Sequence, residues 1–324
     1  MNLLPDRHFP GLAPRSSPLS GRTNGHLPTS TPLAAQGNRA RLPGELVPID
    51  SRNRAANNPV IMRLKQLTYL SDDDQAEIVD AFYPPRKALP KSGLDRSQDH
   101  SSSVLFIQQG FAYRYICLPD GRQQITSLLV PGDSCDPLAL AAPNTEHGIC
   151  ALTTVTYSEI KRPVLVSLVE NNPRIAVALW RSFLLTEAML YERIASLGQR
   201  SAKERLAHFL CEVFFRCRAV GLTSGLQCSL PLSQGDLGDT LGLSLVHTNR
   251  SLMALRADRL IKLEARLLTI LDLSRLQETA HFNPKYLQLQ PEAASPTRTT
   301  PARLGSAPAN NVMAFDHPHR GAHA

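Results

Sequence analysis

The sequence of 324 residues lacks any apolar run of the roughly 20 residues that a membrane-spanning helix needs. Its start is interrupted by Pro5, Pro10 and Pro14, where a secretory signal would require a continuous apolar segment. None of its six cysteines shows the C-x-x-C spacing of a zinc knuckle or a local iron–sulfur motif. We therefore expect a cytoplasmic protein with reduced thiols and no membrane-spanning segment.

Proline is concentrated at the two ends of the chain. Of the 25 prolines, nine lie in residues 1–60 and five in residues 291–324. The N-terminal segment also has hardly any aromatic side chains, so it buries too little apolar surface to offset the entropy of ordering. The composition predicts a disordered extension over residues 1–58 and a disordered tail over residues 288–324.

The first part of the folded body changes from helical to strand periodicity. Ser71 with Asp74 three residues later predicts a capped short helix over residues 75–81. The Pro119-Asp120-Gly121 segment further along predicts a hairpin turn. Short strands separated by turn residues predict a β-sandwich or β-barrel domain over residues 59–170. The expected strand runs, rich in β-branched and aromatic residues, are 104–107, 111–118, 125–130 and 149–160.

Residues 171–199 are predicted to form one long helix that begins near Pro173. Apolar side chains cover too much of its circumference for burial on one side only. It is either a seam between two copies of the chain or a helix buried within one chain. We favour the dimer, because only a modest sheet domain precedes the helix. The apolar positions that repeat at spacings of three and four are Trp180, Phe183, Leu190, Ile194 and Leu197, with Glu187 interrupting them, and a second stripe comprises Leu179, Phe183, Thr186 and Leu190.

Residues 233–270 form the most informative segment. Ser233 with Asp236 predicts the capped start of a short helix, after a capped helix that begins at Ser201 with Glu204. Gly242 then predicts a tight turn, and Ser244 caps a second helix. Helix, tight turn and helix in this order predict a helix-turn-helix motif. The spacing on the second helix predicts a buried face of Thr248, Leu252 and Leu255.

The opposite face of that second helix carries side-chain types that suit the major groove of DNA. Arginine donates two hydrogen bonds to guanine, asparagine pairs with the edge of adenine, and an apolar tip contacts the thymine methyl group. Serine and glutamine at helix N-termini can bind phosphates. The alternative is a helical hairpin with solvated polar residues, but the runs 260–263 and 267–271 predict a two-stranded wing with Arg266 at its tip. The predicted DNA-binding residues are Ser233, Gln234, Ser244, Leu245, Val246, His247, Asn249, Arg250 and Arg266.

The strand-rich domain, the long helix, and the segment SQGDLGDTLGLSLVHTNRSLMALRADRLI before a wing together resemble the Crp/Fnr superfamily of bacterial transcription regulators, over residues 60–287. The resemblance implies an α+β fold with an N-terminal double-stranded β-helix of the cyclic-nucleotide-binding type. It also implies a dimerisation helix, and a winged helix-turn-helix over residues 200–287 that reads a palindromic operator in double-stranded DNA. RNA polymerase would be a further partner of an activator. The resemblance implies that the residues that contact bases are Leu245, Val246, Asn249 and Arg250. Because Leu245-Val246 stands where some members of the family have Arg-Glu, we expect an operator that differs from the operator of those members.

The sensor domain departs from the cyclic-nucleotide-binding members of that family. Those members carry Gly-Glu-Leu followed by Arg-Ser/Thr-Ala, whereas residues 144–148 here hold no arginine and Glu146 would repel a phosphate. Cyclic AMP and cyclic GMP are therefore disfavoured, and the effector and any cofactor stay unknown. The N-terminal cysteine cluster of the iron–sulfur members is missing, since no cysteine precedes Cys117. The candidate effector-pocket residues are Gly132, Asp133, Cys135, Asp136 and His147, with Cys135 or Cys150 as a redox sensor and His147 as a haem ligand as further possibilities.

The distribution of charge agrees with a nucleic-acid partner. The net charge is +7, and residues 200–290 hold twelve Lys and Arg against eight Asp and Glu. We find no nucleophile–base arrangement, phosphate-cradling loop or metal-ligand spacing, so the chain is not expected to be an enzyme. The leading hypothesis is a homodimeric, sequence-specific transcription regulator. The alternative is a ligand-responsive or thiol-redox-responsive sensor that acts mainly through protein association.

Overall fold

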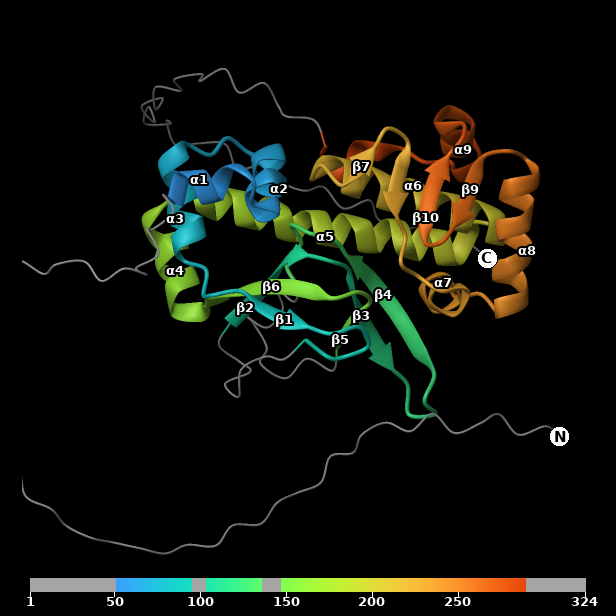
Figure 1. Ribbon diagram of the computed structural model, residues 1–324, viewed down its shortest axis with the longest axis horizontal. Helices are drawn as coiled ribbons and strands as arrows, with labels where there is room; N and C mark the ends of the chain where they lie inside the picture. The colour runs from blue at the N-terminus through green and yellow to red at the C-terminus, as the bar shows by residue number, and fades with distance from the viewer. Residues whose placement is uncertain (1–50, 95–102, 136–146, 290–324) are drawn as a thin grey trace, which may run out of the picture. The chain divides into compact units, whose positions relative to one another are not determined.

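The computed structural model describes residues 51–94, 103–135 and 147–289. An N-terminal helical and strand-rich part is followed by two long helices and a smaller C-terminal module (Figure 1). The helices are α1 (Ser51–Ala56), α2 (Pro59–Leu67), α3 (Asp72–Asp80), α4 (Arg162–Asn171), α5 (Pro173–Gln199), α6 (Ala202–Ala219), α7 (Gln234–Leu241), α8 (Leu245–Ala257), α9 (Leu273–Ala280) and the 3-10 helix η2 (Pro284–Leu287). The strands are β1 (Arg86–Ala88), β2 (Ser103–Gln109), β3 (Ala112–Cys117), β4 (Gln123–Leu129), β5 (Gly148–Ala151), β6 (Val155–Lys161), β7 (Thr223–Ser224), β8 (Gln227–Ser229), β9 (Ile261–Glu264) and β10 (Leu267–Ile270).

Two antiparallel sheets form the strand-rich part. One has the strand order β1-β6-β2 and the other β4-β3-β5. The expected hairpin is present, because β3 and β4 pair with Cys117 opposite Gln123 around the Pro119–Gly121 turn. The expected run over 149–160 divides into β5 and β6, which lie in different sheets. The short strand β1, which the sequence pattern did not predict, pairs with β6 at the edge of the first sheet.

The structure corrects the expected boundary of the N-terminal extension at residue 58. Helix α1 begins at Ser51, and Ala55 on this helix is buried. Arg54 forms an ion pair of 2.7 Å with Asp80 at the end of α3. The sequence analysis did not predict this helix because it has few apolar residues. One small buried side chain and one surface ion pair produce no clear helical periodicity of apolar residues. Residues 1–50 and 290–324 lie outside the described residues.

The long helix predicted from Pro173 is α5, which contacts α2, α4 and α6 along its length. Ile175, Ala178, Leu179 and Leu185 are buried on this inner side. Asn172 caps its start by accepting hydrogen bonds from the Arg174 and Ile175 amides. Arg174 in its first turn also binds the buried Asp74 carboxylate of α3 at 2.6 Å, which fixes the helix to the N-terminal helices.

The C-terminal module packs its helices around the buried length of α6. Its small sheet has the strand order β7-β8-β10-β9, and α8 and α9 both contact α6. The capping boxes predicted at Ser71, Ser201 and Ser233 are all present. An α+β fold with a sheet-based sensor domain, a long helix and a C-terminal helix-turn-helix is therefore confirmed.

Candidate nucleic-acid interface

The helix-turn-helix is built from local signals that the structure confirms. The Ser233 hydroxyl accepts from the Asp236 amide at 3.1 Å, and the Asp236 carboxylate accepts from the Ser233 amide at 2.8 Å, which closes the capping box of α7. Gly242 ends α7 in the left-handed region, at a φ of 62°. The Ser244 hydroxyl then accepts from the His247 amide at 3.3 Å and caps α8. The turn between the two helices is thereby fixed at both ends.

Two glycines permit the close packing of this turn. A Cβ atom on Gly238 would lie 2.7 Å from the Leu243 carbonyl oxygen, so only glycine allows α7 to approach the turn. A Cβ atom on Gly242 would lie 3.1 Å from Leu197 Cδ2 at the end of α5. The sequence analysis predicted the turn at Gly242 but did not predict a role for Gly238. A glycine inside a predicted helix is itself a sign of close packing and could have indicated that role.

Arg205 of α6 is a further positioning residue that the sequence analysis missed. Its guanidinium donates to the Leu241 carbonyl at the end of α7 at 2.7 Å and to the Leu197 carbonyl near the end of α5 at 3.0 Å. Carbonyls at helix C-termini lack partners within the helix and carry partial negative charge, so a cation is favourable there. Arg205 therefore joins the long helix to the helix-turn-helix.

The two faces of α8 divide as predicted. Thr248, Leu252 and Leu255 are buried against the module core. The opposite face is exposed and includes Leu245, Val246, His247, Asn249 and Arg250. Ser233, Gln234 and Ser244 are also exposed at the N-termini of the two helices. The hydroxyls of both serines act as cap acceptors. Ser244 Oγ also lies 3.0 Å from His247 Nδ1, so the Ser233 O–H is the more available donor for a phosphate oxygen.

The wing is present as a tight hairpin of β9 and β10. Leu267 pairs with Glu264, so Ala265 and Arg266 form the two-residue turn. Both residues have positive φ values, 47° and 64°, which explains how the turn forms without glycine: it adopts the backbone of a type I′ turn. The Arg266 carbonyl accepts from the Leu230 amide at 2.8 Å, and its exposed side chain stands at the tip of the wing.

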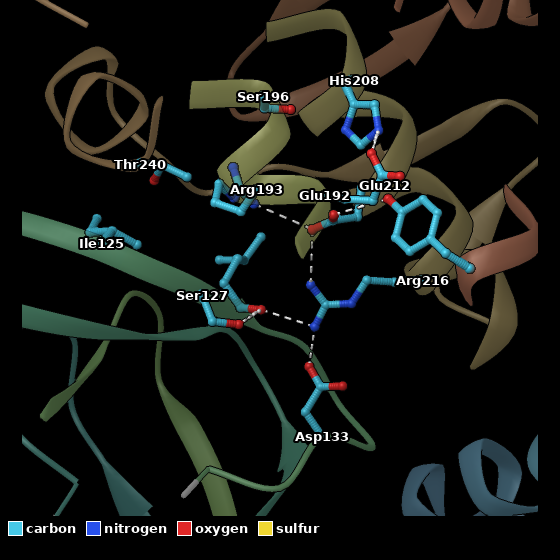
Figure 2. Close-up of polar contacts among 12 residues, drawn as sticks. Ile125, Ser127, Asp133, Glu192, Arg193, Ser196, His208, Glu212, Arg216 and Thr240 are labelled. Carbon is cyan, nitrogen blue, oxygen red and sulfur yellow. Dashed lines mark hydrogen bonds and ion pairs between the residues drawn. The ribbon is translucent and has the colours of Figure 1, made fainter. Parts of the chain in front are cut away.

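The candidate effector-pocket residues have different surroundings. Gly132 has a φ of 96°, and a Cβ atom there would lie 2.7 Å from the Pro59 carbonyl oxygen. The Asp133 carboxylate forms an ion pair with Arg216 of α6. Figure 2 shows Arg216 between Asp133 and Glu212, and Arg216 also donates to the Leu128 carbonyl at 2.9 Å. The sensor loop is therefore tied directly to the C-terminal module.

The remaining pocket candidates are not brought together with this ion pair. The Cys135 side chain is fully buried and its carbonyl accepts from Arg114 Nε at 3.0 Å. His147 is described only as the residue before β5, with its Nδ1 buried and without a hydrogen-bond partner. Asp136 lies outside the described residues. No group of three or more potential metal ligands occurs among the residues that the structure describes.

A sheet-based sensor domain, a long helix and an exposed reading helix with a wing define the class of DNA-binding transcription regulators. Among the described helices, none combines the length and apolar character that crossing a membrane requires. Within this class the chain belongs to the Crp/Fnr family of regulators, which are not enzymes. Residues 204–279 match the model of the Crp-like helix-turn-helix domain.

Relatives support the same family over most of their length. The transcriptional activatory protein AadR of Rhodopseudomonas palustris is 30% identical over 195 residues, which cover 59% of this chain and 79% of that protein. An anaerobic regulatory protein of Haemophilus influenzae is 26% identical over 224 residues, which cover 69% of this chain and 87% of the relative. The structure of FixK2 from Bradyrhizobium japonicum is similar with a TM-score of 0.54 and 25% identity, and the match covers 60% of this chain and 96% of that one.

Proposed function

We propose that the chain is a homodimeric transcription regulator that reads a palindromic operator with α8. The observation that carries this proposal is the reading face itself: Val246, Asn249 and Arg250 are exposed on one side of a helix whose other side is buried. These side chains supply an apolar contact, an adenine reader and a guanine reader. Two copies related by a twofold axis would place their helices in half-sites about 34 Å apart.

The roles of the predicted DNA-binding residues can be separated by how they change sequence preference. Arg250→Ala should lower operator affinity by about 1–3 kcal/mol and relax the preference at one base pair of each half-site. Arg266→Ala should weaken binding to all sequences alike and reduce the salt dependence, because the wing contacts a phosphate. Arg122→Ala at the exposed sensor hairpin is the charge-matched control and should leave binding unchanged.

Gel-shift titrations against the chain's own upstream DNA and a scrambled duplex measure these effects. A wild-type protein that binds both duplexes equally would contradict the proposal. Arg250→Ala with unaltered base preference would contradict the assignment of α8 as the reader.

The dimer is supported by an apolar stripe on α5. Trp180, Tyr191 and Ile194 are 63%, 62% and 66% exposed. Four of the predicted positions, Trp180, Leu190, Ile194 and Leu197, are exposed, whereas Leu179 of the second predicted stripe is buried. Spacings of three and four residues are those of a parallel two-helix seam. The exposed large apolar side chains of α5 are Val177, Trp180, Leu184, Leu190, Tyr191, Ile194 and Leu197.

Substitution of this stripe tests the dimer. Trp180→Glu with Ile194→Glu should give a monomer by analytical ultracentrifugation, because two carboxylates would be buried in the seam. Val166→Glu on the exposed surface of α4 is the control and should remain dimeric. Double-variant protein that sediments as a dimer would contradict the assignment of α5.

We propose that residues 51–170 form the sensor domain, that 171–199 serve dimerisation and that 200–287 bind DNA, with RNA polymerase as a further partner if the output is activation. The alternative is a thiol sensor that acts through protein association. It is less favoured for Cys135, whose side chain has no exposed surface for an oxidant to reach, whereas Cys150, the other candidate, is half-buried.

A further inference from the structure

A small cavity lies where the sensor loop meets α2, α5 and α6. Its volume is about 10 Å³, which is room for a single small solvent molecule or ion. Arg63 of α2, Arg114 of β3 and Arg216 of α6 line it, with Asp133 from the loop. These four residues come from four separate parts of the sequence, so the cavity exists only in the folded chain.

Arg63 is the unusual member of this group. Arg63 is only 4% exposed, and its Nη1 group donates a long hydrogen bond of 3.4 Å to Gln66 Oε1. Its Nη2 group is buried and has no hydrogen-bond partner. Burial lowers the pKa of Arg63 to about 10, so the group still carries its charge at neutral pH. A buried charged donor without a partner is strongly disfavoured in proteins.

The nearby carboxylates are already shared among other guanidiniums. Asp133 accepts from Arg216 and from the Val130 amide through the same oxygen, Oδ2. Glu212 Oε1 lies 3.4 Å from Arg193 Nη2 and 3.7 Å from Arg216 Nη1. A water molecule in the cavity could accept the free N–H of Arg63 but could not offset its charge.

We propose that the cavity binds a small monovalent anion of the size of chloride, held by the Nη2 group of Arg63. The volume excludes an organic effector in this conformation. The bound anion neutralises the charge of Arg63 and so holds the Gly132–Asp133 loop against the C-terminal module. This site does not depend on DNA binding, and its test is independent of the operator.

Thermal unfolding of the full-length protein tests the site at constant ionic strength, with sodium gluconate replaced stepwise by sodium chloride or sodium bromide. Gluconate is too large for the cavity, so the wild-type unfolding temperature should rise and saturate as the halide increases. Arg63→Gln should abolish this saturable rise. Arg122→Gln on the exposed hairpin should retain it, since its surroundings are solvent.

Anomalous scattering from crystals grown in bromide provides a second measurement on the wild-type protein, which decides the matter even if Arg63→Gln does not fold. A bromide peak within contact distance of Arg63 Nη2 is expected. An unfolding temperature that is equal in gluconate and halide overturns the proposal, as does a halide response that Arg63→Gln retains. A cavity that scatters only as water overturns it as well.

Discussion

Removal of Arg216 is expected to be among the most damaging single changes in this protein. Its side chain is 2% exposed and the Asp133 side chain 12% exposed, so solvent replaces little of what is lost. Methionine would fill much of the volume but would leave Asp133 without its cation and the Leu128 carbonyl without its donor. Breaking a buried ion pair by removing one partner costs about 3–5 kcal/mol, and we expect Arg216→Met to cost this much.

A second variant separates the loss of the pair from the loss of packing. When Asp133→Leu is combined with Arg216→Met, no uncompensated charge remains at the Asp133 position. The double variant should therefore lose less free energy of unfolding than the sum of the two single variants. Arg122→Met removes the exposed pair with Asp120 and serves as the control, which should leave the free energy of unfolding nearly unchanged because solvent screens this pair.

Urea-induced unfolding followed by circular dichroism measures these free energies at one pH and one chloride concentration. A cost below about 1 kcal/mol for Arg216→Met would refute the reasoning, because it would mean that water replaces the guanidinium at no penalty. Strict additivity in the double variant would refute it separately, because it would show that Asp133 and Arg216 do not interact.

Two further predictions concern single groups. Gly242→Ala should destabilise the protein by about 1–2 kcal/mol in the same urea assay, because the residue has a φ of 62° and the new Cβ would crowd Leu197; an unchanged midpoint would contradict this. His208 is buried beside Arg200 and Arg193, and burial first and then these charges lower its pKa from 6.5 to about 3. As the pH falls, His208 is therefore protonated in the unfolded chain before it is protonated in the folded protein. The free energy of unfolding should decrease as the pH drops from about 6.5 toward 3, by about 2 kcal/mol at pH 5. His208→Gln should flatten this part of the profile of unfolding free energy against pH, and an identical slope would contradict the assignment.

The ion pair of Arg216 and Asp133 gives the sensor a physical link to the DNA-binding module. A second link lies at the hairpin, where the Gln124 side-chain amide donates to the Asp239 carbonyl of α7 at 2.6 Å.

The sequence by itself determined the DNA-reading end of the protein. The caps at Ser233 and Ser244, the turn at Gly242 and the buried stripe through Leu252 depend on residues within one or two helical turns, so spacing and residue type were sufficient. The wing was also predicted, although its turn uses positive φ values at Ala265 and Arg266 that composition does not reveal.

Tertiary structure alone decided which surfaces meet. Arg216 and Asp133 are 83 residues apart in the chain, and no local pattern could pair them or place Arg63 beside them. The exposed side of α5 likewise depended on what packs against its other side, because the sequence made it apolar almost all round. Local geometry is encoded by neighbouring residues, whereas burial, the sharing of counter-charges and the free face of a helix are fixed only when distant segments pack together.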